Sequence, residues 1–341
     1  MRTYDKKIND FFYYWLVISF ILIFIMIIVG GLTRLTDSGL SITEWELFKG
    51  ILPPLNNEVW NEYFTLYKMI PQYELINNDM TMEEFKIIFY WEYFHRILGR
   101  IIGLFFLIPL LYFSLKKNIN KKYLYSCYIA LFLITFQGFL GWYMVQSGLV
   151  NNVTVSHYRL SLHLGAAFLI ISIIFWILLN HRKQTFYNFF MNKKLNYYFY
   201  FLIMIIFLQI ILGAFVSGLD AGRIYQTWPL MNYSYFPREI ELLDLSNFFN
   251  FDNHGLVQFY HRNIAYLIIV YVLILGYIIL KMNNKKLIFS FYILSFFLFL
   301  QILLGIMTLI SGLNIYLASS HQICSLLLML SAINLHYNYI N

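Results

Sequence analysis

The sequence has little charge and almost no cysteine. Only 12% of its 341 residues are Asp, Glu, Lys or Arg, whereas 60% are hydrophobic, which excludes an ordinary water-soluble globular protein. The two cysteines, Cys127 and Cys324, lie in separate apolar segments without a CxxC spacing. This excludes a disulfide framework and a thiolate metal site, and we expect both cysteines to be buried as small hydrophobic side chains.

The sequence also lacks a concentrated basic patch. Its formal net charge is +7, but the basic residues are mostly spread over short connections between apolar segments, so nucleic acid is not an expected partner. The positive-inside rule accounts for this distribution and places both termini on the cytoplasmic side. The long connections, residues 31–88 and 218–256, then lie on the outer side. We expect a multi-pass protein of a bacterial inner membrane, surrounded by the lipid bilayer.

Apolar segments long enough to cross a bilayer, about 20 residues in a helix, are abundant. They predict eight transmembrane helices near residues 11–30, 89–114, 123–145, 157–180, 197–217, 257–281, 287–310 and 316–338. The first apolar run is longer than the core of a signal peptide and lacks a small-x-small cleavage site, so we expect it to be a true helix. The predicted fold class is an all-α integral membrane protein.

The second half of the chain repeats the first. Around the two long connections, the residues that match without a gap are Gly30, Asp37, Gly39 and Trp45 on Gly213, Asp220, Gly222 and Trp228. Further along, Gln137 and Gly141 match Gln301 and Gly305. Because four spans per half return the chain to the same side, the repeat is parallel. We expect two pseudo-symmetric four-helix bundles, formed by residues 1–195 and 196–341.

Four histidines occupy matched places in this repeat: His95 and His163 in the first half, His261 and His321 in the second. Each is predicted near the outer start of a helix, so all four lie at one depth. Two histidines on two helices at a common depth can approach a planar cofactor from opposite faces, as axial haem ligation requires. The sequence therefore predicts two bis-histidine haem sites with these residues as iron ligands.

Three other roles for these histidines fit the sequence less well. A single intramembrane histidine can be satisfied by a carbonyl group, but repetition in both halves and the cost of an ionisable group at this depth favour function. A copper site with soft ligands fits less well, because no cysteine or methionine is near both members of a pair in sequence. A proton-relaying transporter does not account for the helix-paired positions. The histidines without a repeat partner, expected near the interfaces, are His157, His181, His254 and His336.

The two halves differ one helical turn before the first histidine of each pair. Glu92 precedes His95, whereas Gln258 precedes His261. A carboxylate near a cofactor can exchange protons with a bound substrate, and glutamine cannot. We therefore expect the first half to be catalytic and the second to be structural or electron-carrying.

Arginines lie close to the histidines in sequence: Arg96, Arg100, Arg159 and Arg262. Guanidinium groups bind carboxylates bidentately and stay charged, so we expect these residues to hold haem propionates. Snorkelling to the interface explains single arginines nearly as well. An ion pair of Arg96 or Arg100 with Glu92 would instead make that carboxylate structural.

Six short motifs carry a resemblance to a known family. They are GGLTRLTDSGLSITEW at 30–45, EYFHRILGR at 92–100, RLSLHL at 159–164, GLDAG at 218–222, QFYHRNIAY at 258–266 and LASSHQ at 317–322. Together they resemble haem A synthase over nearly the whole length of the chain. The resemblance implies oxidation of the methyl group at pyrrole carbon eight of haem O to the formyl group of haem A, for cytochrome oxidase biogenesis.

The resemblance also implies a role for each half. The substrate haem O is expected at His95 and His163, with Glu92 as the essential carboxylate, and a resident haem b at His261 and His321. Two successive oxidations of the methyl carbon, through an alcohol and an aldehyde hydrate, are expected, with Glu92 as proton acceptor. The first outer loop contains no cysteine, so the chain resembles the cysteine-free group of proteobacteria and mitochondria.

A di-haem electron-transfer cytochrome or quinol oxidoreductase is the alternative from another class. It fits the repeat and the four histidines equally well, but it does not explain the exchange of Glu92 for Gln258. Its haems would usually be spaced across the membrane rather than held at one depth. For the synthase, the expected partners are haem O, haem O synthase, cytochrome oxidase assembly factors, an electron acceptor whose identity the sequence leaves open, and a second copy of the chain.

Overall fold

The computed structural model describes residues 6–44, 49–117, 119–150, 152–183, 186–191, 193–240 and 248–341. In these ranges, eight helices are long and apolar enough to span a bilayer. They are α1 (Lys6–Leu35), α4 (Met82–Lys116), α5 (Lys121–Val145), α6 (His157–Arg182), α7 (Asn196–Gly218), α8 (His254–Lys281), α9 (Lys285–Ile310) and α10 (Ile315–Ile340). The prediction of an all-α protein with eight spans is confirmed. Trp45, which belonged to the loop match, lies outside the described residues.

Several helices begin on a polar capping residue rather than on the first apolar one. Before α4, the Thr81 hydroxyl accepts a bond from the Glu84 backbone N–H, and the Glu84 carboxylate accepts one from the Thr81 N–H at 2.8 Å. This capping box satisfies free N–H groups of the first turn, so α4 begins at Met82 rather than at residue 89. Asparagines cap α8, α9 and α10 in the same way: Asn253, Asn284 and Asn314.

The chain divides into two compact units, Met1–Ile174 and Phe175–Asn341. The boundary falls inside α6, so this helix begins in the first unit and its last turns belong to the second. The sequence-based division at residue 195 follows the connection after α6 and concerns function; it stays a prediction, as does the pseudo-symmetric pairing of two bundles.

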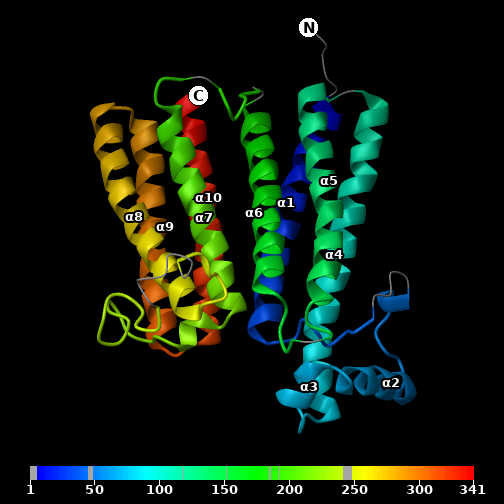
Figure 1. Ribbon diagram of the computed structural model, residues 1–341. Helices are drawn as coiled ribbons and strands as arrows, with labels where there is room; N and C mark the ends of the chain where they lie inside the picture. Colours follow the sequence, from blue (N-terminus) through cyan, green and yellow to red (C-terminus); the bar gives the residue numbers. More distant parts are fainter. Residues whose placement is uncertain are drawn as a thin grey trace. The chain divides into compact units, whose positions relative to one another are not determined.

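In the first unit, α1 lies antiparallel to α4 (Figure 1). Trp15 on α1 is fully buried, and its indole N–H donates to the Phe105 carbonyl of α4 at 3.0 Å. Phe12 and Phe113 pack around the same indole ring. These contacts fix the first turns of α1 along the last turns of α4.

The outer loop of the first unit contains two short helices, α2 (Asn57–Lys68) and α3 (Pro71–Leu75), where the sequence analysis expected only a long connection. A hydrophobic cluster joins them to α4; its buried members are Leu40, Ile42, Trp60, Phe64, Tyr67, Ile70, Phe85, Phe89 and Val155. The Tyr67 hydroxyl donates to the Gln72 amide oxygen at 3.1 Å, and the Gln72 amide N–H donates to the Asp37 carbonyl at 3.1 Å. The loop is therefore a packed element anchored on the start of α4.

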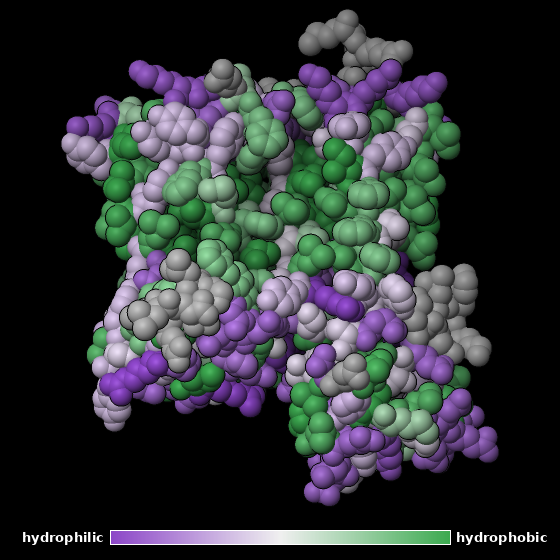
Figure 2. Space-filling view, viewed as in Figure 1, coloured by the Kyte–Doolittle hydropathy of each residue, from purple (hydrophilic) through white to green (hydrophobic). Residues whose placement is uncertain are grey.

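In the second unit, α10 packs against α9 and α7, and α7 packs against α8. A short turn of helix, η2 (Ala221–Arg223), follows α7. Figure 2 shows hydrophobic residues gathered over the middle of the long helices and hydrophilic ones at their ends, as a bilayer requires.

The repeat is visible in the turn that follows α1 and α7. Asp37 and Asp220 both adopt the left-handed conformation, with φ of 51° and 50°. The backbone N–H of each donates to a carbonyl three residues earlier, Arg34 and Ser217, at 3.2 Å in both cases. The aligned residues thus build the same chain reversal in each unit.

Candidate functional site

Each unit brings together the two histidines that the sequence assigns to its half. The ring centres of His95 on α4 and His163 on α6 are 6.5 Å apart. Those of His261 on α8 and His321 on α10 are also 6.5 Å apart. Since an imidazole nitrogen lies about 2 Å from a bound metal ion, two imidazoles on opposite sides of one iron have a separation of this order.

The imidazoles have unused hydrogen-bonding capacity. In all four rings the Nδ1 atom is buried and has no hydrogen-bond partner among the described residues. Buried polar atoms are rarely left unsatisfied without a functional reason. The four histidines therefore fit a bound group that contains a metal ion, which the rings would coordinate.

A glycine on the preceding long helix makes room for each ring. A β-carbon placed on these glycines would meet the imidazole Cε1 at 3.0 Å for Gly30 and His95, 3.5 Å for Gly141 and His163, 3.2 Å for Gly213 and His261, and 2.8 Å for Gly305 and His321. At three of these four positions a side chain would press on the ring. The matched glycines that revealed the repeat thus form cradles for the predicted ligands.

Glutamine side chains contact three of the histidines. Gln137 donates to the His163 carbonyl at 2.9 Å, and Gln209 donates to the His261 carbonyl at the same distance. The amide nitrogen of Gln301 lies 3.2 Å from His321 Nε2. Sequence reasoning noted Gln137 and Gln301 only as repeat markers and missed Gln209, although its place four residues before Gly213 repeats the same spacing.

Glu92 is buried, and both of its carboxylate oxygens accept hydrogen bonds. One carboxylate oxygen accepts bonds from the Ser41 hydroxyl at 2.7 Å and the Ile42 N–H at 2.9 Å. The other accepts two bonds from the Arg96 guanidinium, at 2.6 and 3.0 Å. Arg96 also donates to the Ile42 carbonyl at 2.7 Å. Glu92, one turn before His95, and Arg96, directly after it, together fasten the first outer loop to α4. This is the ion pair that the sequence analysis named as the structural alternative for Glu92.

The second unit has the same fastening without the carboxylate. The Gln258 amide donates to the Tyr225 carbonyl at 3.0 Å, and Arg262 donates to that carbonyl at 2.9 Å. Tyr225 occupies the repeat position of Ile42. This helix position therefore holds the loop in both units, but Glu92 accepts hydrogen bonds from the loop, whereas Gln258 donates one and carries no charge.

Comparison with known proteins agrees with this arrangement. The sequence model of a family described as cytochrome oxidase assembly protein matches residues 13–333. The chain belongs to this family. It is 50% identical over 320 residues to the protein named heme A synthase of Pelagibacter ubique, covering 93% of each chain. It is 43% identical to the heme A synthase of Rickettsia felis and 41% identical to that of Flavobacterium psychrophilum, covering 92% of this chain and 94% of each relative.

The remaining arginines expected at the site of this family member lie in the first unit. Arg159 donates to the Tyr143 carbonyl at 2.5 Å, and its guanidinium lies 3.7 Å from the centre of the Tyr143 ring. Arg100 lines a crevice with Tyr93 and Arg96 beside the fastened loop. Glu44 also lines this crevice, and Arg96 is already ion-paired with Glu92.

The four histidines without a repeat partner lie at helix ends or within two turns of them. His157 and His181 are mostly buried, and His336 is fully buried between aromatic rings, with its Nε2 3.0 Å from the Phe189 carbonyl. These three side chains are packed inside the protein, and their interfacial position stays a prediction. Only His254 of the four is exposed.

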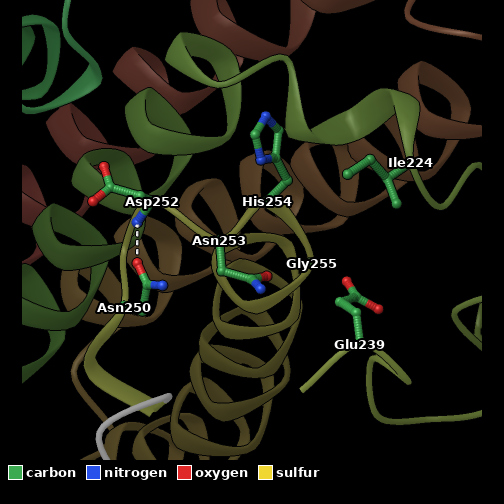
Figure 3. Close-up of a pocket in the computed structure, with 7 residues that line it drawn as sticks. All are labelled: Ile224, Glu239, Asn250, Asp252, Asn253, His254 and Gly255. Carbon is green, nitrogen blue, oxygen red and sulfur yellow. Dashed lines mark hydrogen bonds between the residues drawn. The ribbon is translucent and has the colours of Figure 1, made fainter. Parts of the chain in front are cut away.

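His254 lines a pocket of about 360 Å³ in the second unit (Figure 3). Its other polar lining residues are Glu239, Asn250, Asp252 and Asn253, and the Asp252 N–H donates to the Asn250 side chain at 3.1 Å. None of the four paired histidines lines this pocket, so it is separate from the predicted haem ligands.

Proposed function

We propose that the protein is a haem A synthase, which oxidises the methyl group at pyrrole carbon eight of haem O to the formyl group of haem A for cytochrome oxidase biogenesis. Relatives of that name match nearly the whole chain. The observation in the structure that carries the proposal is the presence of two like histidine pairs, one per unit, of which only one has a carboxylate a turn away.

In this proposal the first unit binds the substrate and the second holds a resident haem b. His95 and His163 bind haem O, and His261 and His321 are the ligands of haem b. Arg96, Arg100, Arg159 and Arg262 supply positive charge for the propionates. The equal spacing of the two pairs supports two haem sites, and the Glu92 carboxylate supports chemistry at the first.

Haem supplies the redox chemistry when it is bound, and the protein positions the substrate and handles protons. In net terms, the methyl group and one water give the formyl group, four protons and four electrons. The electrons pass to the electron acceptor, and Glu92 is the proposed acceptor of protons released at the carbon. Its carboxylate is now bound by Ser41, Ile42 and Arg96. When Oε2 accepts a proton, the Ser41 hydroxyl can turn its hydrogen to the Ile88 carbonyl, 3.3 Å away, and accept the new bond from Glu92.

The orientation of the protein follows from its charges. We propose an inner-membrane location with both termini in the cytoplasm, because the lysine-rich connections after α4, α6 and α8 lie at the helix ends remote from the histidines. The loops that hold Glu92 and Gln258 then face the outer side. The haem O supplier, the electron acceptor and a second copy of the chain are proposed partners on the basis of the family.

The proposed function is tested by haem extraction and mass analysis of membranes that make haem O. We expect haem A with the wild type and not with Glu92→Gln. The matched control is Glu83→Gln, which removes an exposed carboxylate of the same helix that pairs with Lys86. Unchanged haem O beside a bound, reducible haem b in the wild type would contradict the synthase and favour the electron-transfer cytochrome.

A further inference from the structure

Three of the four helices that face a predicted haem ligand carry a glutamine four residues before the cradle glycine. The pairs are Gln137 with Gly141 on α5, Gln209 with Gly213 on α7, and Gln301 with Gly305 on α9. A spacing of four places both residues of each pair on one helix face. The glycine lies against the imidazole and the glutamine lies one turn along the same face.

Each of these glutamines has a free acceptor next to its histidine. The three amide oxygens are buried and have no hydrogen-bond partner among the described residues. Gln209 additionally places its amide nitrogen 3.3 Å from His261 Nε2, so the side chain reaches both the backbone and the ring. A histidine that coordinates a metal through one nitrogen presents an N–H on the other and needs an acceptor for it. Gln301 supplies that acceptor when its amide turns over, because its amide nitrogen now lies 3.2 Å from His321 Nε2. Gln137 and Gln209 hold the backbone carbonyl of their histidine instead.

The helix facing His95 breaks the pattern. On α1, Gly30 is retained and lies against the His95 ring, but the residue four positions earlier is Met26. The Met26 methyl carbon lies 3.4 Å from the β-carbon position of Gly99, one turn beyond His95 on α4. The Met26 side chain therefore lies against α4 one turn beyond His95. A thioether donates no hydrogen bond and is a weak acceptor.

We propose that Gln137, Gln209 and Gln301 are positioning residues for the iron ligands, and that Met26 leaves His95 as the one ligand without an amide partner. Both ligands of the second unit are then held in a fixed orientation, which suits a haem that stays. The first unit has one held ligand and one less constrained ligand, which suits a haem that must enter as substrate and leave as product. The inference deepens the proposed function and rests on it.

Haem retention by the purified full-length protein in detergent tests this assignment. We load wild type and variants with haem b and measure transfer to excess apomyoglobin, together with the low-spin haem signals in electron paramagnetic resonance. Removal of an outer-shell partner of a metal-bound histidine typically costs 10–100-fold in affinity. We therefore expect Gln209→Met and Gln301→Met to speed haem loss from the second site by about this factor and to shift its low-spin signal.

The reverse change is made in the first unit. Met26→Gln supplies the missing amide, and we expect it to slow haem loss from the first site and to shift that site's signal towards the second. Thr135→Met is the matched control: Thr135 lies two residues before Gln137, is exposed, and bonds only its own helix at the Leu131 carbonyl in the described contacts. It is expected to leave both rates unchanged.

Two outcomes would overturn the inference. Haem loss and low-spin signals like those of the wild type in all three glutamine and methionine variants would show that the amides do not position the ligands, even if haem A is made normally. A wild-type protein that binds no haem would overturn the proposed function as well. We expect Met26→Gln to retain haem longer than the wild type, and misfolding cannot produce such a gain. The inference can therefore be tested even if Gln209→Met or Gln301→Met fails to fold.

Discussion

The Ser41 hydroxyl donates a hydrogen bond of 2.7 Å to the Glu92 carboxylate and so joins the first outer loop to α4. The Ile42 N–H binds the same oxygen at 2.9 Å. In the second unit, Gln258 makes the corresponding contact by donating to the Tyr225 carbonyl. The same helix position therefore holds a loop in both units, and only in the first unit does it also carry a titratable group.

Replacement of Ser41 by alanine tests the loop contact. A hydrogen bond to a charged group contributes about 1.5–3 kcal/mol, and Ser41 and Glu92 are both buried. We expect Ser41→Ala to weaken the attachment of the loop to α4 by roughly tenfold or more, to lower haem A formation, and to speed proteolytic cleavage of residues 31–88. Thr65→Ala, on the exposed side of α2, is the control and should behave as wild type. If Ser41→Ala is cleaved at the same rate as the wild type, the attachment of the loop to α4 does not depend on this hydrogen bond.

Two substitutions of Glu92 separate the effect of its charge from the effect of its side-chain length. Glutamine keeps the length of the side chain and an oxygen for the Ile42 N–H, whereas aspartate keeps the charge but is one methylene shorter. If Glu92 accepts a proton, Glu92→Asp retains part of the haem A formation and Glu92→Gln retains none. In Glu92→Gln the amide nitrogen replaces an oxygen that accepts bonds, so the protease resistance of the loop falls and is measured in parallel. The reverse order of haem A formation, measured by mass analysis, would show that Glu92 acts only by holding the loop.

The spans and the histidine pairs could be predicted because their signals are local in sequence. Apolar runs of bilayer length fix the helices, and the repeat places His95, His163, His261 and His321 on matched helices. The helix α2 has a local signal as well, because Trp60, Phe64 and Tyr67 recur at helical spacing in a polar stretch and are buried.

The contacts of the site could not be predicted because they depend on packing between distant segments. Ser41 binds Glu92 across 51 positions, and nothing in the local sequence of either residue marks the other. The glycine repeat was visible, but only the packed helices show that Gly305 lies against His321. The hydrogen-bond partners of a buried group depend on the tertiary structure, and they cannot be identified from a single sequence when they lie far apart along the chain.

The stability of the first outer loop should depend on pH through Tyr67. Burial raises the pKa of the Tyr67 phenol above its ordinary value of 10.0, and nearby carboxylates raise this pKa further, although the bond from Asn77 lowers it. Below pH 10 the phenol is protonated in the folded and unfolded loop alike, so its contribution is fully present. As pH rises above 10, the unfolded loop ionises first and stability is lost progressively up to the folded pKa.

Hydrogen exchange of residues 57–75 between pH 8.5 and about 11, corrected for the intrinsic rate, measures this loss. Tyr67→Phe removes the titrating group and should abolish the pH dependence above 10, while costing about 1–3 kcal/mol at lower pH because the Gln72 and Asn77 side chains lose a buried partner. If Tyr67→Phe shows the same pH dependence of hydrogen exchange as the wild type, another titrating group causes that dependence.

Alanine substitutions at the cradle glycines should lower haem retention in the order of their distance from the imidazole. In the second unit, the β-carbon would lie 2.8 Å from His321 Cε1 in Gly305→Ala and 3.2 Å from His261 Cε1 in Gly213→Ala. Overpacking of this kind costs about 1–3 kcal/mol, and a displaced ring weakens metal binding. We expect a larger loss of bound haem b in Gly305→Ala than in Gly213→Ala, measured by absorbance and haem content after purification.

Glycines in the same kind of helix provide the controls. A β-carbon on Gly103 or Gly138 meets no atom within 4 Å, and alanine is a better helix former than glycine by up to about 1 kcal/mol. Gly103→Ala and Gly138→Ala should therefore retain haem at least as well as the wild type. If Gly305→Ala also retains it, the His321 ring can move without loss of the iron bond, and the glycines serve helix packing rather than ligand placement. A loss confined to Gly305→Ala and Gly213→Ala, graded by distance, is the result that the cradle geometry requires.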